Sequence, residues 1–261
     1  MTKSYTAALV VIGNEILSGR TQDKNINYLA NTLVECGVRL VEVRIVPDIE
    51  DDIVFAVREL KDKVDYLFTT GGIGPTHDDI TAQSIAKALD RDLVKNGQAY
   101  EMLEAHYGRD EFTQPRQKMA YVPRGSKLIP NPVSVAPGFI CQNVYVMAGV
   151  PEIMRMMLDH VVRTLEGGDK ILSRTVPSRF PESMMAEVLA EVQERYKGQV
   201  DVGSYPYFQD GHFGVNVVLR SSESKALTQA VMEVELFISA LEDNVLSDHD
   251  LELAALDTDK I

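Results

Sequence analysis

Short apolar runs and amphipathic segments alternate along the first third of the chain. Residues 7–13 form a continuous apolar run that ends in glycine, which is typical of a strand buried on both faces. Further strands are expected at 38–46 and 65–70, and apolar residues recur at helical spacing over 26–34 and 49–60. This alternation predicts an α/β fold, with a mostly parallel sheet covered by helices on both faces.

The later part of the chain changes its pattern after a Gly-rich segment. The elements that continue the α/β pattern are a helix over 78–89, a strand at 144–147 and a helix over 151–165. Beyond them we expect strands at 171–176, 200–205 and 213–220, and helices at 181–196 and 222–241. We therefore predict a first domain over residues 1–167 and a small α+β domain over residues 168–243.

The chain is acidic. It has 261 residues and a net charge of −13, and its last twenty positions hold seven acidic residues and one lysine. Residues 244–261 are therefore expected to form an acidic, disordered tail. Nucleic acid is not an expected partner, because its binding requires clustered Lys and Arg. An anionic ligand would have to be held by backbone N–H groups, a few arginines or a metal ion.

The cysteines and the N-terminus indicate the cellular compartment. Cys36 and Cys141 lie in apolar surroundings without metal-site spacing, so both are expected to be reduced core thiols. The N-terminus is short and polar, and the sequence has no apolar run of the length that spans a membrane. We expect a cytoplasmic protein without a membrane partner.

Three loops follow predicted strands, at residues 13–25, 47–52 and 71–81. In parallel α/β sheets, ligands bind beyond the carboxyl ends of the strands. The three loops can therefore converge on one ligand although they are far apart in the sequence.

The strongest local signal is the segment 69–81, TTGGIGPTHDDIT. Glycines let the backbone approach phosphate oxygens, and a helix N-terminus after them would present unpaired N–H groups. The segment is neither a Walker motif, since no lysine follows the glycines, nor the dinucleotide pattern Gly-x-Gly-x-x-Gly. A phosphate-binding loop competes with a tight turn whose helix is capped by Thr76 or Asp78.

Several acidic residues accompany these loops. Asp78 and Asp79 would repel a bound phosphate unless a hard divalent cation lay between them, which favours metal bridging. Asp48 is either a cap of the helix that begins near residue 49 or a second carboxylate at the crevice where the three loops converge. Asn25 could likewise cap its helix, whereas Glu15 is expected at the rim of this crevice.

Several stretches of the sequence, in their order along the chain, match one known pattern: 12–19, Asp23 with Asn25, 69–81, 136–139 and 147–151, with 203–208 in the smaller second domain. They resemble the N-terminal region of the competence/damage-inducible protein A (CinA) family, within the molybdopterin-binding superfamily. The segment 131–139, NPVSVAPGF, is also similar to the N-terminal region of eukaryotic FAD synthases.

The resemblance implies a three-layer α/β/α sandwich with a small α+β C-terminal module. The ligand would be a nucleotide diphosphate or a molybdopterin-like small molecule. The closest branch is expected to hydrolyse a nucleotide pyrophosphate such as ADP-ribose or FAD with a divalent metal. Essential carboxylates of molybdopterin adenylyltransferases match Asp48 and Asp79, which are therefore the expected catalytic residues. Relatives of this fold commonly self-associate, so a homo-oligomer is expected.

The expected site combines backbone and carboxylate groups. Backbone amides of Gly71 to Thr76 would hold the diphosphate. The expected metal ligands are Asp48, Asp78, Asp79 and Glu15, for Mg²⁺, Mn²⁺ or Co²⁺, and a monovalent cation is a further candidate cofactor. The expected ligand-binding residues are Gly13, Asn14, Asn25, Gly71, Gly72, Gly74, Thr76, Thr81, Asn131, Ser134, Ala136, Pro137 and Gly138.

Other functions stay open on the sequence alone. The same loop would serve a molybdopterin adenylyltransferase or binding protein, with a pterin phosphate as the nucleophile in place of water. A non-enzymatic nucleotide-binding protein is the third possibility. Longer members of the family carry a nicotinamide mononucleotide deamidase domain that this sequence does not contain, so deamidase activity is not expected.

Overall fold

The computed structural model describes residues 5–209 and 211–258, with side chains described up to residue 243 except at 209 and 212. The chain divides into an N-terminal unit, Met1–Asp169, and a C-terminal unit, Lys170–Ile261. This division lies two residues after the end of the first predicted domain. Each unit has its own core.

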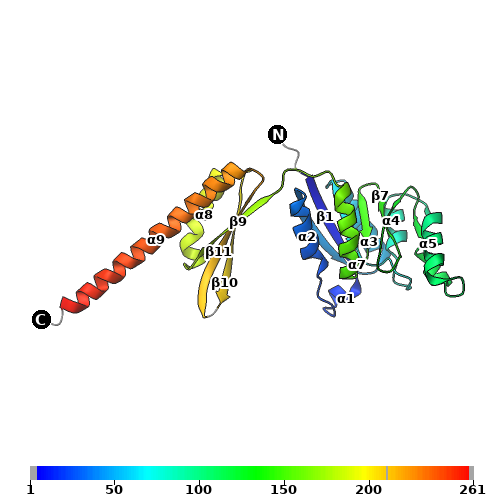
Figure 1. Ribbon diagram of the computed structural model, residues 1–261, viewed down its shortest axis with the longest axis horizontal. Helices are drawn as coiled ribbons and strands as arrows, with labels where there is room; N and C mark the ends of the chain where they lie inside the picture. Colours follow the sequence, from blue (N-terminus) through cyan, green and yellow to red (C-terminus); the bar gives the residue numbers. More distant parts are fainter. Residues whose placement is uncertain (1–4, 210, 259–261) are drawn as a thin grey trace. The chain divides into compact units, whose positions relative to one another are not determined.

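The N-terminal unit is built on a six-stranded sheet with the order β2-β1-β3-β8-β7-β6 (Figure 1). Strand β7 runs antiparallel to both of its neighbours, and the other pairs are parallel. The prediction of a mostly parallel sheet is confirmed. The strands, in chain order, are β1 (Tyr5–Ile12), β2 (Val38–Val46), β3 (Tyr66–Thr70), β6 (Lys127–Ile129), β7 (Gly138–Cys141) and β8 (Val144–Met147).

The side chains of β1 point alternately to the two faces of this sheet. Ala8, Val10 and Ile12 pack in the core under α3 (Glu50–Lys61) and α4 (Thr81–Ala88). The intervening residues of the strand pack in a second core under α2 (Asn25–Glu35) and α7 (Pro151–Val161). A strand buried on both faces explains the continuous apolar run. The three-layer α/β/α sandwich is therefore confirmed.

Residues 90–126 form a region for which the sequence predicted no elements. Its three-residue strands pair as a separate two-stranded sheet, β4 with β5. Leu103, Phe112 and Met119 form the centre of its small apolar cluster. The elements of this region are β4 (Leu93–Lys95), α5 (Gly97–Tyr107), α6 (Gln114–Lys118) and β5 (Tyr121–Pro123), and two short pieces elsewhere are α1 (Asn14–Leu17) and η1 (Val162–Thr164).

The C-terminal unit is an antiparallel sheet of order β10-β11-β9 packed against two helices. Val215, Val217 and Leu219 alternate along β11 and face the core that α8 and α9 complete. The small α+β module is thus present. Its elements are β9 (Leu172–Ser178), α8 (Glu182–Arg195), β10 (Asp201–Gln209), β11 (His212–Ser221) and α9 (Ser224–Thr258).

The predicted disordered tail differs from the structure, because α9 continues through most of residues 244–261 to Thr258. Leucine and alanine recur there and are strong helix formers, and this propensity outweighs the signal from net charge. Residues 259–261 lie outside the described residues.

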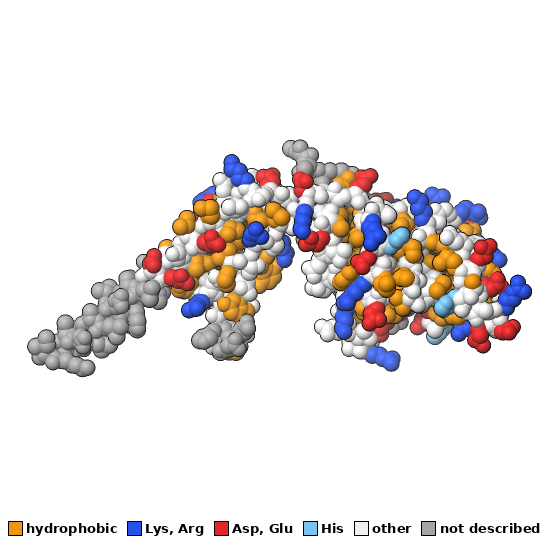
Figure 2. Space-filling model, in the orientation of Figure 1, with side chains coloured by type: hydrophobic (Ala, Val, Ile, Leu, Met, Phe, Trp, Pro, Cys, Tyr) orange, Lys and Arg blue, Asp and Glu red, His pale blue; other side chains and the backbone are white. Residues whose placement is uncertain are grey.

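The surface and the helices give two further findings. On the face of the N-terminal unit seen in Figure 2, acidic and basic side chains are interspersed among apolar ones. Among the residues that the structure describes, no helix is both long and apolar enough to cross a membrane.

Candidate functional site

A cavity of about 550 Å³ lies beyond the carboxyl ends of β1, β2 and β3. We call it the main cavity. Its lining includes Gly13, Glu15 and Asp48 from the first two predicted loops and residues Gly71 to Asp79 from the third, with the exception of His77. Cavities of this size are typical of small-molecule sites. The three loops therefore meet as the sequence predicted.

Asp48 ties two of these loops together. Its Oδ2 accepts a hydrogen bond of 2.9 Å from the backbone N–H of Asn14. Helix α3 begins at Glu50 with Ile49 at its N-cap, so the alternative that Asp48 caps this helix is wrong. The half-buried carboxylate is instead held against the end of β1, at the rim of the cavity.

The glycine loop approaches its neighbours so closely that side chains do not fit. Gly71 has φ +104°, and a Cβ added there would lie 2.1 Å from the carbonyl oxygen of Ile12. A Cβ on Gly72, at φ +65°, would lie 2.2 Å from Oγ1 of Thr81. Thr81 donates from Oγ1 to the carbonyl of Gly71 at 2.9 Å and from N to that of Gly72 at 3.0 Å. Thr81 thus stabilises the glycine loop through these two hydrogen bonds.

Three backbone N–H groups of the loop are available to a ligand. Gly71 N donates to Met147 O at 3.1 Å and Thr76 N donates to Asp79 Oδ2 at 2.8 Å. Within the described part of the chain, the N–H groups of residues 72–74 have no acceptor. The expected set of amides from Gly71 to Thr76 therefore narrows to Gly72, Ile73 and Gly74.

Asp79 shapes the end of this loop. Its Oδ2 accepts hydrogen bonds from both the N–H and the hydroxyl of Thr76. Helix α4 begins at Thr81 with Ile80 at its N-cap, so neither Thr76 nor Asp78 caps it. Helix α4 therefore begins later than the predicted start at residue 78, because residues 76–79 form this turn.

The carboxylates of the main cavity differ in exposure. Asp78 is exposed, and hydrogen bonding to Thr76 and to its own backbone, together with His77 and Lys118, lowers the pKa of its carboxyl group. In the described residues, no three His, Cys, Asp or Glu side chains lie close enough together to hold a metal ion. Mg²⁺ is usually bound by one or two carboxylates, with water and substrate phosphates as further ligands. The four expected metal ligands, Asp48, Asp78, Asp79 and Glu15, are therefore not brought together as one group, and a cation here would need water and substrate phosphates among its ligands.

The segment 131–138, which holds five of the expected ligand-binding residues, also reaches the main cavity in part. Asn131, Ser134 and Ala136 line it. Asn131 organises the loop, because Oδ1 accepts from Ser134 N at 3.1 Å and Nδ2 donates to Ala136 O at 2.9 Å. Pro137 lines a neighbouring cavity, and Gly138 is buried in β7, where a Cβ would lie 2.3 Å from Val146 O.

Asn25 lies behind the cavity wall. It is 4% exposed, and Nδ2 donates to the carbonyl of Gly149, a lining residue, at 2.8 Å. Asp23 Oδ1 accepts from Ile26 N at the start of α2, so the capping alternative for Asn25 is wrong. Asn14 contributes its N–H to Asp48 and is not among the lining residues.

The region 90–126 supplies residues that the sequence did not indicate. Tyr107 and Met119 complete the main cavity. Lys118 donates from Nζ to the carbonyl oxygen of Thr76 at 2.9 Å, which brings a positive charge to the glycine loop. Its position depends on tertiary packing alone, 42 residues from Thr76 in the sequence.

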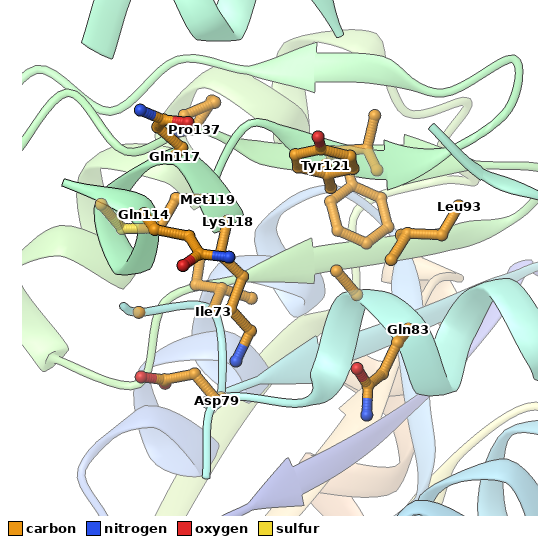
Figure 3. A pocket seen from close by; sticks show the side chains of 15 residues that line it. Ile73, Asp79, Gln83, Leu93, Gln114, Gln117, Lys118, Met119, Tyr121 and Pro137 are labelled. Atoms are coloured by element: carbon orange, nitrogen blue, oxygen red, sulfur yellow. The ribbon is translucent and has the colours of Figure 1, made fainter. Parts of the chain in front are cut away.

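A second cavity of about 300 Å³ adjoins the first (Figure 3). We call it the side cavity. Gly72, Ile73, Gly74, Asp79 and Met119 line both cavities, so the glycine loop separates them.

Each of the two units matches a different family of known proteins. Residues 8–167 match the family described as probable molybdopterin binding domain, and residues 170–246 match FAD synthase, middle domain. A protein of Caldivirga maquilingensis is 38% identical over 208 residues, which are 77% of this chain and 81% of the relative. A CinA-like protein of Thermosipho melanesiensis is 31% identical over 196 residues, which are 72% of this chain and 49% of that protein.

A solved structure also shows similarity to part of the chain. It is the crystal structure of the protein CinA, with unknown function, from Thermoplasma acidophilum. The two are 34% identical with a TM-score of 0.60, and the match covers 62% of this chain and 98% of the other.

Proposed function

This chain belongs to the family of probable molybdopterin binding domains, and on that premise we propose that it hydrolyses a nucleotide pyrophosphate such as ADP-ribose or FAD with a divalent cation. One observation carries the proposal: the carboxylates of Asp48 and Asp79 and the free amides of residues 72–74 line a single cavity. Amides at such positions suit phosphate oxygens, and the carboxylates suit a hard cation.

The charges in the cavity explain why a cation is needed. Among the described residues that line the main cavity, four are acidic and none is Lys or Arg. Two unit charges about 5 Å apart repel by about 3 kcal/mol at an effective dielectric constant of about 20. A diphosphate would meet several such repulsions, which Lys118 beside the loop offsets only in part. A cation shared by carboxylates and phosphates removes them.

Each group then has a role in the hydrolysis. A divalent cation held by Asp48 and Asp79 would supply charge neutralisation and a bound water of lowered pKa. The N–H groups of Gly72, Ile73 and Gly74 donate to the non-bridging oxygens on which charge accumulates. The N–H of Asn14 fixes the Asp48 carboxylate before the ligand arrives. Water adds to one phosphorus and gives up a proton to the solvent, while the bond from that phosphorus to the bridging oxygen breaks and this oxygen leaves with the other phosphate group.

The test is a panel of nucleotide diphosphates, each with Mg²⁺, Mn²⁺ or Co²⁺, with products identified by mass. Asp48→Asn keeps an oxygen that can accept the Asn14 N–H, so the fold should survive while turnover falls by about a hundredfold or more. The control is Asp110→Asn, an exposed residue outside both cavities. Metal-dependent turnover that is unchanged in Asp48→Asn or in Asp79→Asn would refute the assignment.

A molybdopterin ligand is the second candidate, because the family match itself favours it. The glycine-loop amides would then hold the pterin phosphate, and the reaction would be adenylyl transfer. Pterin fluorescence in protein purified from a host that makes molybdopterin would favour this function. Hydrolysis of nucleotide diphosphates without bound pterin would favour the first.

A further inference from the structure

The outer edge of β2 is open. The sheet order places this strand at one end of the sheet, and β1 pairs with its inner edge from Val38 to Val46. Among the strands that the structure describes, none pairs with the outer edge. Two large apolar side chains of β2 are exposed, Val41 at 48% and Ile45 at 39%. The helices on the two faces of the sheet therefore leave this edge accessible.

The backbone groups along this edge have a defined register. Gly13 N donates to the carbonyl of Val46 at 3.1 Å, so the backbone groups of Val46 point toward β1. Backbone groups of successive strand residues point to alternate sides, and the pairing with β1 is regular from Glu42 onward. The N–H and C=O groups of Val43 and Ile45 therefore point away from β1, toward the open edge.

Strand β2 lacks most of the features that prevent association between sheet edges. Natural edge strands are often short, or they carry proline, lysine or a bulge. With nine residues, β2 is the longest strand of its sheet, and it contains neither proline nor lysine. A register shift opposite Ala7 and Ala8 leaves Val41 as an extra residue. The segment from Glu42 to Val46 stays regular and can pair with a further strand.

The charge pattern of β2 is complementary to a second copy of itself. When two copies run antiparallel about a twofold axis at Val43, Glu42 of each lies opposite Arg44 of the other. The two exposed apolar residues, Val41 and Ile45, then also lie opposite each other. Such charged and apolar cross-strand pairs stabilise antiparallel strands. An axis at Ile45 would instead place Glu42 opposite Asp48, which are two carboxylates.

We propose that two copies of this chain associate through β2, so that their sheets join into one. The N–H of Val43 in each copy donates to the Val43 carbonyl of the other, and Glu42 and Arg44 exchange their contact within the chain, at 2.7 Å, for contacts between copies. Pairing through so short a segment buries little surface, so the dimer dissociates reversibly on dilution. The inference does not depend on nucleotide hydrolysis.

Charge reversal tests this register. Glu42→Arg gives each strand two arginines, and Arg44→Glu gives each strand two glutamates. In sedimentation equilibrium of the full chain, either variant alone should dimerise at least about tenfold more weakly than the wild type. An equimolar mixture of the two variants should recover the association, because every arginine then lies opposite a glutamate. Loss of the pair within the chain does not explain such a recovery, since both variants lack that pair.

A matched control separates this surface from a general effect of charge. Glu101→Arg makes the same charge change at an exposed residue of α5, outside the sheet, and should leave the association unchanged. Melting curves confirm that each variant is folded. A wild type that stays monomeric at its highest soluble concentration would overturn the inference. Association that neither reversal weakens would also overturn it, as would two weakened variants that fail to associate when mixed.

Discussion

Replacing Gly71 by alanine should destabilise the N-terminal unit strongly. The residue has φ +104°, and the new methyl group would lie 2.1 Å from the carbonyl oxygen of Ile12, the last residue of β1. The left-handed backbone costs a side chain about 1–2 kcal/mol. Forcing a methyl group into a closed contact costs about 1–3 kcal/mol more. Because backbone rather than a flexible side chain is in the way, we expect a total loss of about 2–5 kcal/mol.

Urea unfolding followed by circular dichroism measures this loss. A domain of this size should melt about 2–4 °C lower for each kcal/mol, so the melting temperature should fall by about 4–20 °C. Gly149→Ala gives a milder step, because its Cβ would lie 3.2 Å from Gly71 Cα. Gly97→Ala is the control: no atom lies within 4 Å of the added Cβ, and alanine should stabilise α5 by up to about 1 kcal/mol. A Gly71→Ala protein as stable as the wild type would refute the reasoning.

Three further predictions concern stability, charge and metal. Tyr66→Phe should lower the free energy of unfolding, measured in urea, by about 1–3 kcal/mol. The Tyr66 hydroxyl donates a hydrogen bond to the carbonyl of Glu166 and accepts one from its N–H, and phenylalanine loses both. Burial raises the pKa of Tyr66 from 10.0 to about 12, so its contribution should be complete below pH 10, decline toward pH 12, and be absent from the phenylalanine variant. Lys118→Met should weaken α,β-methylene-ADP binding by about tenfold in calorimetry with little change in melting temperature, since its bond is to the exposed Thr76. Chelation should abolish turnover and added Mn²⁺ or Mg²⁺ should restore it; turnover that survives exhaustive chelation would contradict the role of the cation.

Much of the fold follows from hydrophobic periodicity. The predicted strands at 38–46 and 144–147 match β2 and β8 residue for residue. Strand β8 is buried along its whole length and is continuously apolar, whereas β2 lies at the edge of the sheet and is indicated by its β-branched residues. The segment 90–126 has strands of three residues, too short for alternation to show. Lys118, which lies in that segment, could not be predicted as a neighbour of the loop.

The candidate site was predictable in its parts but not in its hydrogen bonds. A carboxylate that follows a strand and precedes a helix can cap the helix or contact a distant loop, and local sequence does not distinguish the two. Asp48 contacts a distant loop, because its carboxylate accepts a hydrogen bond from the N–H of Asn14, 34 residues away in the sequence. The amides of Gly71 and Thr76 were expected to face the ligand, yet both are bonded within the protein, to Met147 and Asp79. These bonds depend on strand order and turn geometry, which composition does not specify.

The most direct measurement is a crystal structure with α,β-methylene-ADP and Mn²⁺, in which anomalous scattering locates the metal. Phosphate oxygens should accept hydrogen bonds from the N–H groups of Gly72, Ile73 and Gly74. The Mn²⁺ peak should lie between those oxygens and the carboxylates of Asp48 and Asp79. Phosphates bound elsewhere on the protein, or Mn²⁺ remote from both carboxylates, would contradict the account.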